Sequence, residues 1–237
     1  EKLFNLRVAR GCLDECAYCA LRAAHGALVS KPLADVLAEA RAGLAQGRRE
    51  QALIGADVGA WGQDRGTSCV ELLRELLALD EGLRLHVGDF NPRWIIRYRE
   101  ELVPLLGPRR RQVASMLLPI QSGSEAVLRR MRRGYSRTEL IQSLAELRRA
   151  LPGVWLATHV MIGFPGETEA DFEDTLTALD AIGFDEISVY KYSHRPGTEA
   201  ATMPDPVGEW RKIARLWRYR RWARARYGRQ TPAGAAA

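Results

Sequence analysis

The sequence predicts an α/β protein in which six parallel strands, wound by helices, form an open partial barrel. Three observations support this fold class. Short apolar runs alternate with longer segments of helical periodicity, and no strand-like run directly follows another. The six units are too few for a closed barrel of eight strands. Loops rich in cysteine, glycine or polar residues follow most of the strands, where parallel barrels carry their catalytic groups.

The expected strands are short apolar runs bounded by glycine, proline or polar residues. The first one ends at a cysteine-rich loop, and the second ends at a loop over 56–67 that contains glycine, aspartate and tryptophan. In chain order the strands cover residues 3–8, 51–55, 83–87, 113–120, 154–162 and 186–192.

The expected helices have apolar residues at helical spacing, and several carry start or stop signals. The helix over 32–47 stops at Gly47. The helix over 92–106 has a proline in its first turn, and Pro104 should end it early. The helix over 167–182 begins with acidic residues, as the helix dipole favours. The remaining helices cover residues 70–79, 125–131, 138–150 and 209–226.

Length and composition indicate one soluble globular domain, because 237 residues with 46% hydrophobic and 27% charged content can bury one substantial core. No apolar run is long enough to span a membrane, and the first residues do not resemble a signal peptide. Three clustered cysteines and a distant fourth do not form a disulfide framework, which predicts a reducing cytoplasm. We expect residues 1–203 to form the barrel and residues 204–237 a basic, aromatic helix and tail packed on the same domain.

The cysteine-rich loop carries the strongest chemical signal. Cys12, Cys16 and Cys19 have the spacing C-x3-C-x2-C, with Tyr18 before the last cysteine. Three thiolates lack the fourth ligand of a closed zinc site, but they can hold a 4Fe–4S cluster and leave one iron open. An open iron can chelate a small molecule, which indicates catalysis rather than electron storage.

At these residues the chain resembles the radical S-adenosylmethionine (SAM) superfamily, whose signature is C-x3-C-x-aromatic-C. The resemblance implies that the open iron binds the amino and carboxylate groups of SAM. It also implies reductive cleavage of SAM to a 5′-deoxyadenosyl radical, which takes a hydrogen atom from a C–H bond, with electrons from an external donor such as flavodoxin or ferredoxin.

Within this superfamily the chain is most similar to the radical domain of methylthiotransferases. The similarity covers about residues 4–203 and consists of short motifs that occur in the same order, each beside a strand end. The matching motifs lie at residues 10–12, 55–62, 118–124, 131–135, 163–168 and 192–198.

The resemblance implies contacts to the methionine part of SAM. Gly55, Ala56 and Asp57 fall where the family meets the amino group. Arg133 falls where a guanidinium pairs with the carboxylate. Considered without the cysteines, the glycine-rich loop could be a plain turn, and Arg133 lies in a charge run that could face solvent.

The resemblance also implies contacts to the nucleoside part of SAM. Gln121 and Ser122 are expected to reach the ribose or the carboxylate. The expected adenine neighbours are Tyr18, through its backbone, and Ile162, Gly163, Tyr190 and Tyr192.

Several positions depart from the family pattern. His25, Arg22 and His159 stand where the family usually has arginine, proline and an acidic residue. The methylthiotransferases also have an N-terminal domain with a second cluster and a C-terminal RNA-binding barrel, and neither is expected in this chain. Cys69 could be a small core residue. Alternatively it could anchor a second iron–sulfur cluster or receive sulfur, with His25 and His159 assisting.

The C-terminal helix combines basic and aromatic residues. Between residues 209 and 229, nine Lys or Arg and one Glu give +8, so the rest of the +6 chain carries about −2. This composition is typical of nucleic-acid binding. The alternative is an amphipathic helix that closes the barrel with Trp210, Ile213 and Trp217 while its arginines face water.

The favoured hypothesis is a radical SAM enzyme that inserts sulfur into a small, nucleoside-like precursor, as in thiosugar antibiotic biosynthesis. A second hypothesis is the radical domain of a methylthiotransferase acting on tRNA or a ribosomal protein. A third is an epimerase or dehydrogenase without sulfur insertion. A fourth, from a different class, is a non-catalytic nucleic-acid-binding module built on the C-terminal helix.

Overall fold

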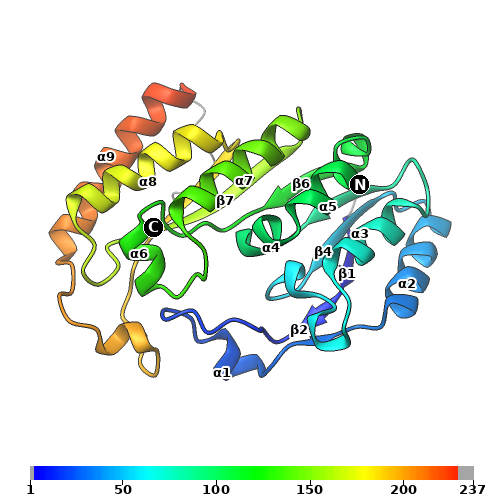
Figure 1. Ribbon diagram of the computed structural model, residues 1–237, viewed down its shortest axis with the longest axis horizontal. Helices are drawn as coiled ribbons and strands as arrows, with labels where there is room; N and C mark the ends of the chain where they lie inside the picture. The colour runs from blue at the N-terminus through cyan, green and yellow to red at the C-terminus, as the bar shows by residue number, and fades with distance from the viewer. Residues whose placement is uncertain (1–2, 229–237) are drawn as a thin grey trace.

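The protein folds as a curved parallel sheet whose outer face is covered by helices, as a computed structural model describing residues 3–228 shows (Figure 1). The strand order is β1-β4-β5-β6-β7-β8, and all neighbouring pairs are parallel. The open partial barrel predicted from the sequence is therefore confirmed. The strands are β1 Phe4–Arg7, β4 Glu50–Ile54, β5 Arg84–Val87, β6 Val113–Leu117, β7 Trp155–Ile162 and β8 Glu186–Lys191.

Helices connect each strand to its parallel neighbour, because a parallel pair needs a long crossover. Ser136 and Thr168 begin α7 and α8 with capping boxes, in which side chain and backbone satisfy each other's hydrogen bonds. The helices are α2 Leu33–Ala45, α3 Cys69–Leu77, α4 Pro92–Arg97, α5 Arg99–Leu106, α6 Glu125–Arg130, α7 Arg137–Ala150, α8 Glu169–Ile182 and α9 Glu209–Tyr227. A short helix in the cysteine loop, α1 Leu21–His25, was not predicted.

The expected effect of Pro104 is wrong. The predicted helix over 92–106 breaks at Tyr98, between α4 and α5, and Pro104 lies inside α5. Pro104 is exposed, as is Glu100, whose carbonyl would have accepted the missing hydrogen bond. Water can satisfy that carbonyl, so the helix continues through the proline.

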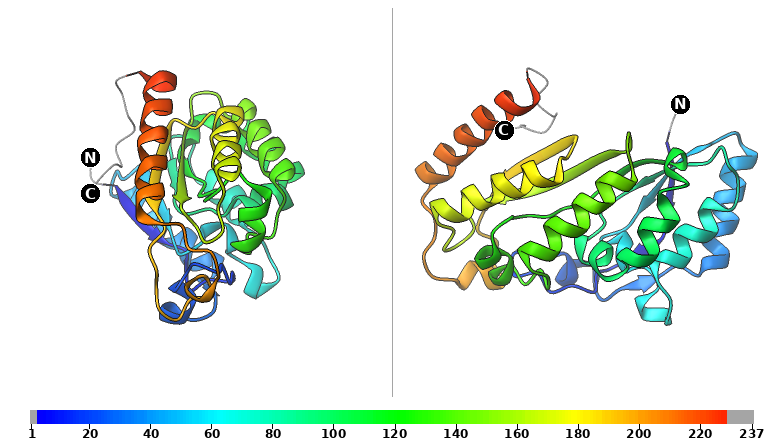
Figure 2. Two further views of the ribbon diagram at one scale, coloured as in Figure 1. Left: turned by 90° about the vertical axis from the view of Figure 1, so that its left-hand side faces the viewer. Right: turned by 45° about the horizontal axis from the view of Figure 1, so that its top comes forward.

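The main core lies between the sheet and its helices. Along β7 the side chains alternate, with Leu156, Thr158, Val160 and Ile162 buried and the residues between them partly exposed. This alternation gives the sheet one face toward the helices and one concave face that solvent reaches. The two edge strands, β1 and β8, border the open side of the barrel (Figure 2).

Backbone hydrogen bonds hold the cysteine loop in place at its base and at its far end. Strands β2 Ala9–Arg10 and β3 Val29–Ser30 pair antiparallel and close the loop. Gly11 has a φ of +68°, and an added Cβ would lie 2.0 Å from the Ala27 carbonyl oxygen, so only glycine fits. At the far end Ala17 donates to the Met131 carbonyl, 3.2 Å, and accepts from the Ala200 N–H, 2.8 Å.

Helix α9 packs beside α8 and the β7–β8 edge, but not with the face expected from its aromatic residues (Figure 1). Trp210 and Trp217 are 84% and 61% exposed, whereas Arg215 is buried. The expectation that the tryptophans close the barrel is therefore wrong. Most arginines of α9 do face water as expected, but Arg215 does not. Arg215 faces inward because α8 and the turn before it supply carboxylates that pair with its guanidinium, as described below.

Two further sequence predictions concern the C-terminal tail and membrane-spanning helices. The predicted tail beyond residue 228 lies outside the described residues. Between residues 3 and 228, no helix combines the length and hydrophobicity that crossing a bilayer requires.

Candidate active site

The three clustered cysteines line one cavity at the carboxyl ends of the strands. Five of the eleven residues expected to bind SAM line it as well: Tyr18, Ala56, Asp57, Gln121 and Arg133. The lining residues are Cys12, Asp14, Cys16, Tyr18, Cys19, Leu21, Ala56, Asp57, Asp89, Asn91, Pro119, Gln121 and Arg133. These residues come from the cysteine loop, from the ends of β4, β5 and β6, and from the turn after α6. The fold thus brings together segments more than 100 residues apart, as the 117-residue separation of Cys16 and Arg133 illustrates.

Each thiol has a polar neighbour. The Asp14 N–H donates to Cys12 Sγ and the Leu21 N–H to Cys19 Sγ, both at 3.4 Å, while Arg133 Nη1 lies 3.5 Å from Cys16 Sγ. Burial raises the pKa of the Cys12 thiol to about 11 and also raises that of Cys19. At neutral pH these thiols are therefore protonated, and each loses its proton when a metal ion binds its sulfur.

The thiols surround the cavity rather than converging on a single point. Within residues 3–228, no three His, Cys, Asp or Glu side chains lie close enough to hold one metal ion. In an iron–sulfur cluster each cysteine binds a different iron, so separated thiols on one cavity suit such a cluster.

Arg133 is a buried cation without a carboxylate partner among the described residues, since no acidic oxygen lies within 4 Å of it. Nε donates to Tyr135 Oη at 3.1 Å, and Nη2 donates to Asn91 Oδ1 at 3.0 Å and to the Pro119 carbonyl at 2.7 Å. Nη1 faces Cys16 and the Tyr18 hydroxyl, 3.4 Å away. A buried charge with only neutral acceptors and a thiol is stabilised when an anion binds beside it.

Asp57 lines the cavity, but its oxygens are largely occupied by the protein. Oδ1 accepts from the N–H groups of Gly59 and Asn91 at 3.1 Å, and Oδ2 accepts from Trp94 Nε1 at 2.7 Å. Burial raises the pKa of Asp57 to about 6. Its main role in the described chain is to hold the loop after β4 against the loop after β5.

Sequence reasoning missed Asn91 and Asp14. The Asn91 side chain donates to Asp14 and accepts from Arg133, and Arg93 forms an ion pair with Asp14. The rule that functional groups follow strands could have indicated Asn91 and Asp89, because both lie in the loop just after β5. A glycine, Gly88, precedes them, so the signal that marked the other loops was present here as well.

Ser122 does not reach the cavity as expected. It is fully buried, and its hydroxyl pairs with Thr175 Oγ1 at 3.2 Å and accepts from the Ser124 N–H at 3.2 Å. Gln121, the residue before it, lines the cavity with a φ of +67°, which is rare for a residue other than glycine. The chain therefore turns sharply here and buries one of the two side chains.

The expected adenine neighbours divide between core and loop positions. Ile162 is buried in the main core, whereas Tyr192 joins a second apolar cluster with Ala17 and Phe164 below the cysteine loop. Tyr190 is 49% exposed and contacts His159 edge-on, with ring centroids 5.4 Å apart.

Gly163 follows β7 in a conformation that requires glycine. Its φ is +74°, and an added Cβ would lie 2.4 Å from Lys212 Cγ. The expected residues on β7 and β8 thus surround a loop that α9 approaches closely.

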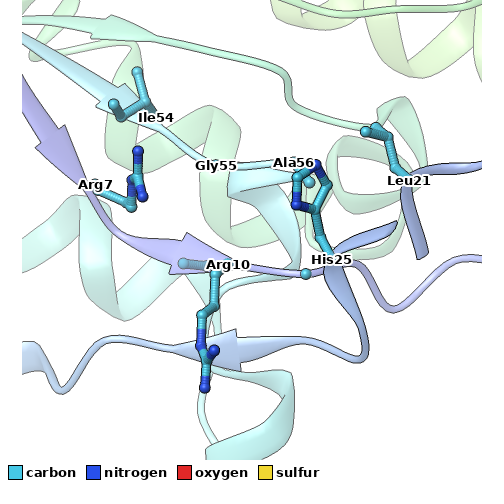
Figure 3. A pocket seen from close by; sticks show the side chains of 9 residues that line it. Arg7, Arg10, Leu21, His25, Ile54, Gly55 and Ala56 are labelled. Atoms are coloured by element: carbon cyan, nitrogen blue, oxygen red, sulfur yellow. The ribbon is translucent and has the colours of Figure 1, made fainter. Parts of the chain in front are cut away.

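The three residues considered for a second cluster or for sulfur chemistry lie in different surroundings. Cys69 has 0% exposure and packs in the main core, and burial raises its pKa well above the usual range. His25 is exposed and lines a neighbouring cavity with Gly55 and Ala56 (Figure 3). His159 lies partly exposed on β7. The structure does not bring these three side chains together, and Cys69 is a core residue.

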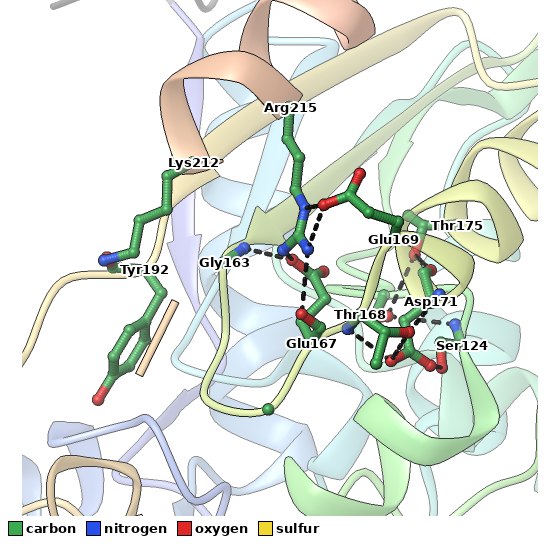
Figure 4. Close-up of polar contacts among 12 residues, drawn as sticks. Ser124, Gly163, Glu167, Thr168, Glu169, Asp171, Thr175, Tyr192, Lys212 and Arg215 are labelled. Carbon is green, nitrogen blue, oxygen red and sulfur yellow. Dashed lines mark hydrogen bonds and ion pairs between the residues drawn. The ribbon is translucent and has the colours of Figure 1, made fainter. Parts of the chain in front are cut away.

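A buried ion pair ties α9 to the loop that contains Gly163 (Figure 4). Glu167 Oε2 accepts from the Gly163 N–H and from Arg215 Nη1, both at 2.6 Å. Arg215 also contacts Glu169 at 2.7 Å, and Lys212 Nζ donates to the Tyr192 carbonyl at 2.9 Å. Glu167 was expected inside the helix, but it precedes α8 because its carboxylate bonds to this loop.

Comparison with known proteins decides the family. The profile of the radical SAM superfamily matches residues 6–179. The chain belongs to the radical SAM superfamily. Members of this superfamily hold a 4Fe–4S cluster and SAM, and the donor set of the cavity, three thiols and a buried guanidinium, fits these groups.

The curated relatives support the similarity to methylthiotransferases. The chain is 38% identical over 204 residues to a tRNA-2-methylthio-N(6)-dimethylallyladenosine synthase from Cereibacter sphaeroides, covering 86% of this chain and 46% of the relative. It is 40% identical over 200 residues to the threonylcarbamoyladenosine tRNA methylthiotransferase of Drosophila melanogaster, covering 84% and 36%. The chain therefore spans less than half the length of these relatives.

Solved structures agree with the fold. The radical SAM methyltransferase TsrM from Kitasatospora setae aligns with a TM-score of 0.68 and 21% identity, over 84% of this chain and 38% of that one. Coproporphyrinogen III oxidase from Escherichia coli aligns with a TM-score of 0.67 and 17% identity, over 94% and 52%. At these identities the comparison supports the radical SAM fold alone.

Replacing Arg133 tests the buried cation. We expect Arg133→Ala to weaken SAM binding about tenfold or more, because a charge-assisted partner of the carboxylate contributes about 1.5–3 kcal/mol. Arg221→Ala is the control, since Arg221 is exposed on α9. Isothermal titration of the reconstituted protein with SAM measures both, and equal losses would contradict the assignment.

Replacing Arg215 tests the buried ion pair that connects α9 to the loop containing Gly163. Burial raises the pKa of Glu167 to about 7, and Arg215 opposes that rise. A carboxyl whose folded pKa is raised lowers the stability of the fold as pH increases from its unfolded pKa to its folded pKa, and the loss is complete above the folded pKa. In Arg215→Met the pKa rises further, so urea denaturation should show a larger deficit at pH 8, about 3 kcal/mol or more, than at pH 6.

The matched control for this experiment is Arg221→Met, which removes an exposed charge from the same helix. Its stability should follow the wild type at both pH values. A deficit in Arg215→Met that does not change between pH 6 and pH 8 would show that the guanidinium does not balance the charge of Glu167.

Proposed function

We propose that this chain is the radical-generating part of a sulfur-inserting enzyme of the methylthiotransferase kind, acting on an adenosine in RNA. The observation that carries the proposal is the cavity in which three thiols face a buried, carboxylate-free guanidinium. The proposal that the substrate is RNA is supported by the relatives, whose names specify modified adenosines of tRNA.

Cys12, Cys16 and Cys19 would hold the cluster, and Arg133 would face the SAM carboxylate. When bound, these groups supply a 5′-deoxyadenosyl radical that removes a hydrogen atom from the substrate. Ala56 and Gln121 line the same cavity, and two backbone hydrogen bonds to β7 hold Gln121 there. Asp57 and Asn91 hold the loops in place, and the apolar cluster with Phe164 and Tyr192 shields the loop from water.

The remaining assignments follow from this proposal. Gly55, with Ala56, would meet the methionine amino group. Ile162, Gly163 and Tyr190 would border the adenine. We infer that residues 1–203 and 204–237 act as one unit, an inference supported by the buried Glu167–Arg215 pair. An electron donor such as flavodoxin or ferredoxin, in a reducing cytoplasm, would supply the electron.

The small-molecule hypothesis, sulfur insertion into a thiosugar precursor, receives less support than the RNA substrate. The relatives named above modify tRNA. Cys69, which that hypothesis used as ligand or sulfur acceptor, is enclosed in the core. We therefore propose no second cluster on the described residues of this chain.

Anaerobic reconstitution with iron and sulfide tests the radical chemistry. The protein should bind about four irons per chain and form 5′-deoxyadenosine from SAM under dithionite. Cys16→Ala should abolish both, because one iron loses its thiolate. Cys69→Ala, a change in the core, should retain both, and retained SAM cleavage in Cys16→Ala would contradict the assignment.

Mass spectrometry of digested RNA tests the substrate. Incubation with dithionite, SAM, sulfide and tRNA containing N6-dimethylallyladenosine should replace one C–H hydrogen of that nucleoside with sulfur. Sulfide supplies the sulfur, 5′-deoxyadenosine carries away the hydrogen, and the cleavage of SAM takes up the two electrons that the new C–S bond releases. The control is the Cys16→Ala protein, which should leave the RNA unchanged. An oxidised or epimerised product without sulfur would support the epimerase or dehydrogenase hypothesis instead.

A further inference from the structure

A basic cavity adjoins the cysteine cavity at the edge of the sheet (Figure 3). It has a volume of about 300 Å³ and lies where β1, β2, α1 and the end of β4 meet. Arg7, Arg10 and His25 are its basic side chains, and its apolar wall includes Leu21 and Ile54. The cluster and SAM assignments above use neither arginine.

The two cavities share a wall. Leu21 and Ala56 line both of them, and the Leu21 N–H donates to Cys19 Sγ at 3.4 Å. Gly11, which lines the basic cavity, directly precedes Cys12. A ligand in the basic cavity would therefore lie beside the loop that holds the cluster.

The basic side chains of this cavity have no acidic partner. Among residues 3–228, the side chains of Arg7, Arg10 and His25 make no hydrogen bond or ion pair. No Asp or Glu is among the residues that line the cavity. Free guanidinium forks at a cavity match the geometry of a phosphate.

The basic surface continues beyond this cavity. A second hollow of about 280 Å³ also has Arg7 and Arg10 in its wall, together with Lys31 and Arg65. Figure 3 shows the Arg10 side chain extending away from His25, whereas Arg7 lies near Ile54. Two adjoining hollows with shared arginines can accommodate successive phosphates, which suits a polymer better than a single phosphate.

We propose that Arg7, Arg10 and His25 bind the phosphodiester backbone of an RNA substrate beside its reacting nucleotide. This inference rests on the proposed function, which it deepens by locating the substrate. The backbone would lie along β1 and β2, and a neighbouring nucleoside would reach the SAM cavity past Leu21 and Ala56. Phosphate contacts of this kind position a nucleic acid without reading its sequence.

The test is RNA binding by the full chain, measured by fluorescence anisotropy with a hairpin RNA that carries adenosine in its loop. In the double variant Arg7→Gln and Arg10→Gln, affinity should fall about tenfold or more for each lost contact. The slope of log affinity against log salt should become shallower by roughly 1–2, because each phosphate contact contributes about 0.7–0.9.

Two double variants serve as controls, and both remove the same number of charges. Arg41→Gln with Arg74→Gln changes exposed arginines of α2 and α3, and Arg221→Gln with Arg224→Gln changes exposed arginines of α9. Neither should lower affinity as Arg7→Gln with Arg10→Gln does. Arg7→Lys with Arg10→Lys should retain the salt slope but lose part of the affinity, since the charge stays and the fork is lost.

Three results would overturn the proposal. Equal losses in all the glutamine variants would indicate general attraction to a basic protein. A loss confined to the α9 variant would place the RNA on α9. Adenosine 5′-monophosphate binding as tightly as the hairpin, with the same loss in Arg7→Gln and Arg10→Gln, would indicate a site for one phosphate. Since binding needs no SAM cleavage, failure here is distinguishable from failure of the proposed reaction.

Discussion

The arrangement of the site depends on one buried guanidinium. Arg133 contacts the cysteine loop, the end of β6 through Pro119, and the loop after β5 through Asn91. The N–H groups of Arg133 restrict the movement of these three segments. A segment that moved away would leave a buried hydrogen-bond acceptor without a donor. The same charge lies without a carboxylate next to Cys16, so the group that orders the loops also provides a positive potential in the cavity. Structural and chemical roles are therefore combined in one side chain, and a substitution there affects both.

A second buried charge supports the opposite wall of the barrel. Arg215 and Glu167 connect α9 to the loop after β7, and that loop contains a glycine whose conformation no other residue adopts easily. Replacing an ion pair of this kind with apolar residues is often neutral or stabilising, so its presence is better explained by orientation than by stability. The helix, which is the most basic part of the sequence, thereby contributes to the site through its buried face rather than its exposed one.

The sequence predicted the strands, their parallel order and the cysteine cavity, because these depend on local periodicity and on close spacing. It did not predict the face of α9, since hydrophobic periodicity assumes that apolar side chains are buried, and here Arg215 is buried by carboxylates distant in sequence. Ser122 was expected to reach the cofactor for a related reason: a position after a strand does not determine which of two successive side chains faces the cavity. For Cys69, the burial agrees with the interpretation as a small core residue. Asn91 was missed because its importance comes from partners 34 to 77 residues away.

The backbone hydrogen bonds of Ala17 have a consequence for how the protein folds and acquires its cluster in the cell. Its hydrogen bonds reach Met131 and Ala200, so the loop takes its final shape only after most of the chain has left the ribosome. The cysteines, by contrast, precede Met131 and Ala200 in the sequence and are therefore synthesised before both. During translation the three thiols are thus exposed on a loop without a completed barrel, open to oxidation or to the wrong metal. We expect the cell to deliver iron and sulfide after translation, to a folded acceptor, and expect overproduced chains to emerge largely without their cluster when folding outpaces that delivery.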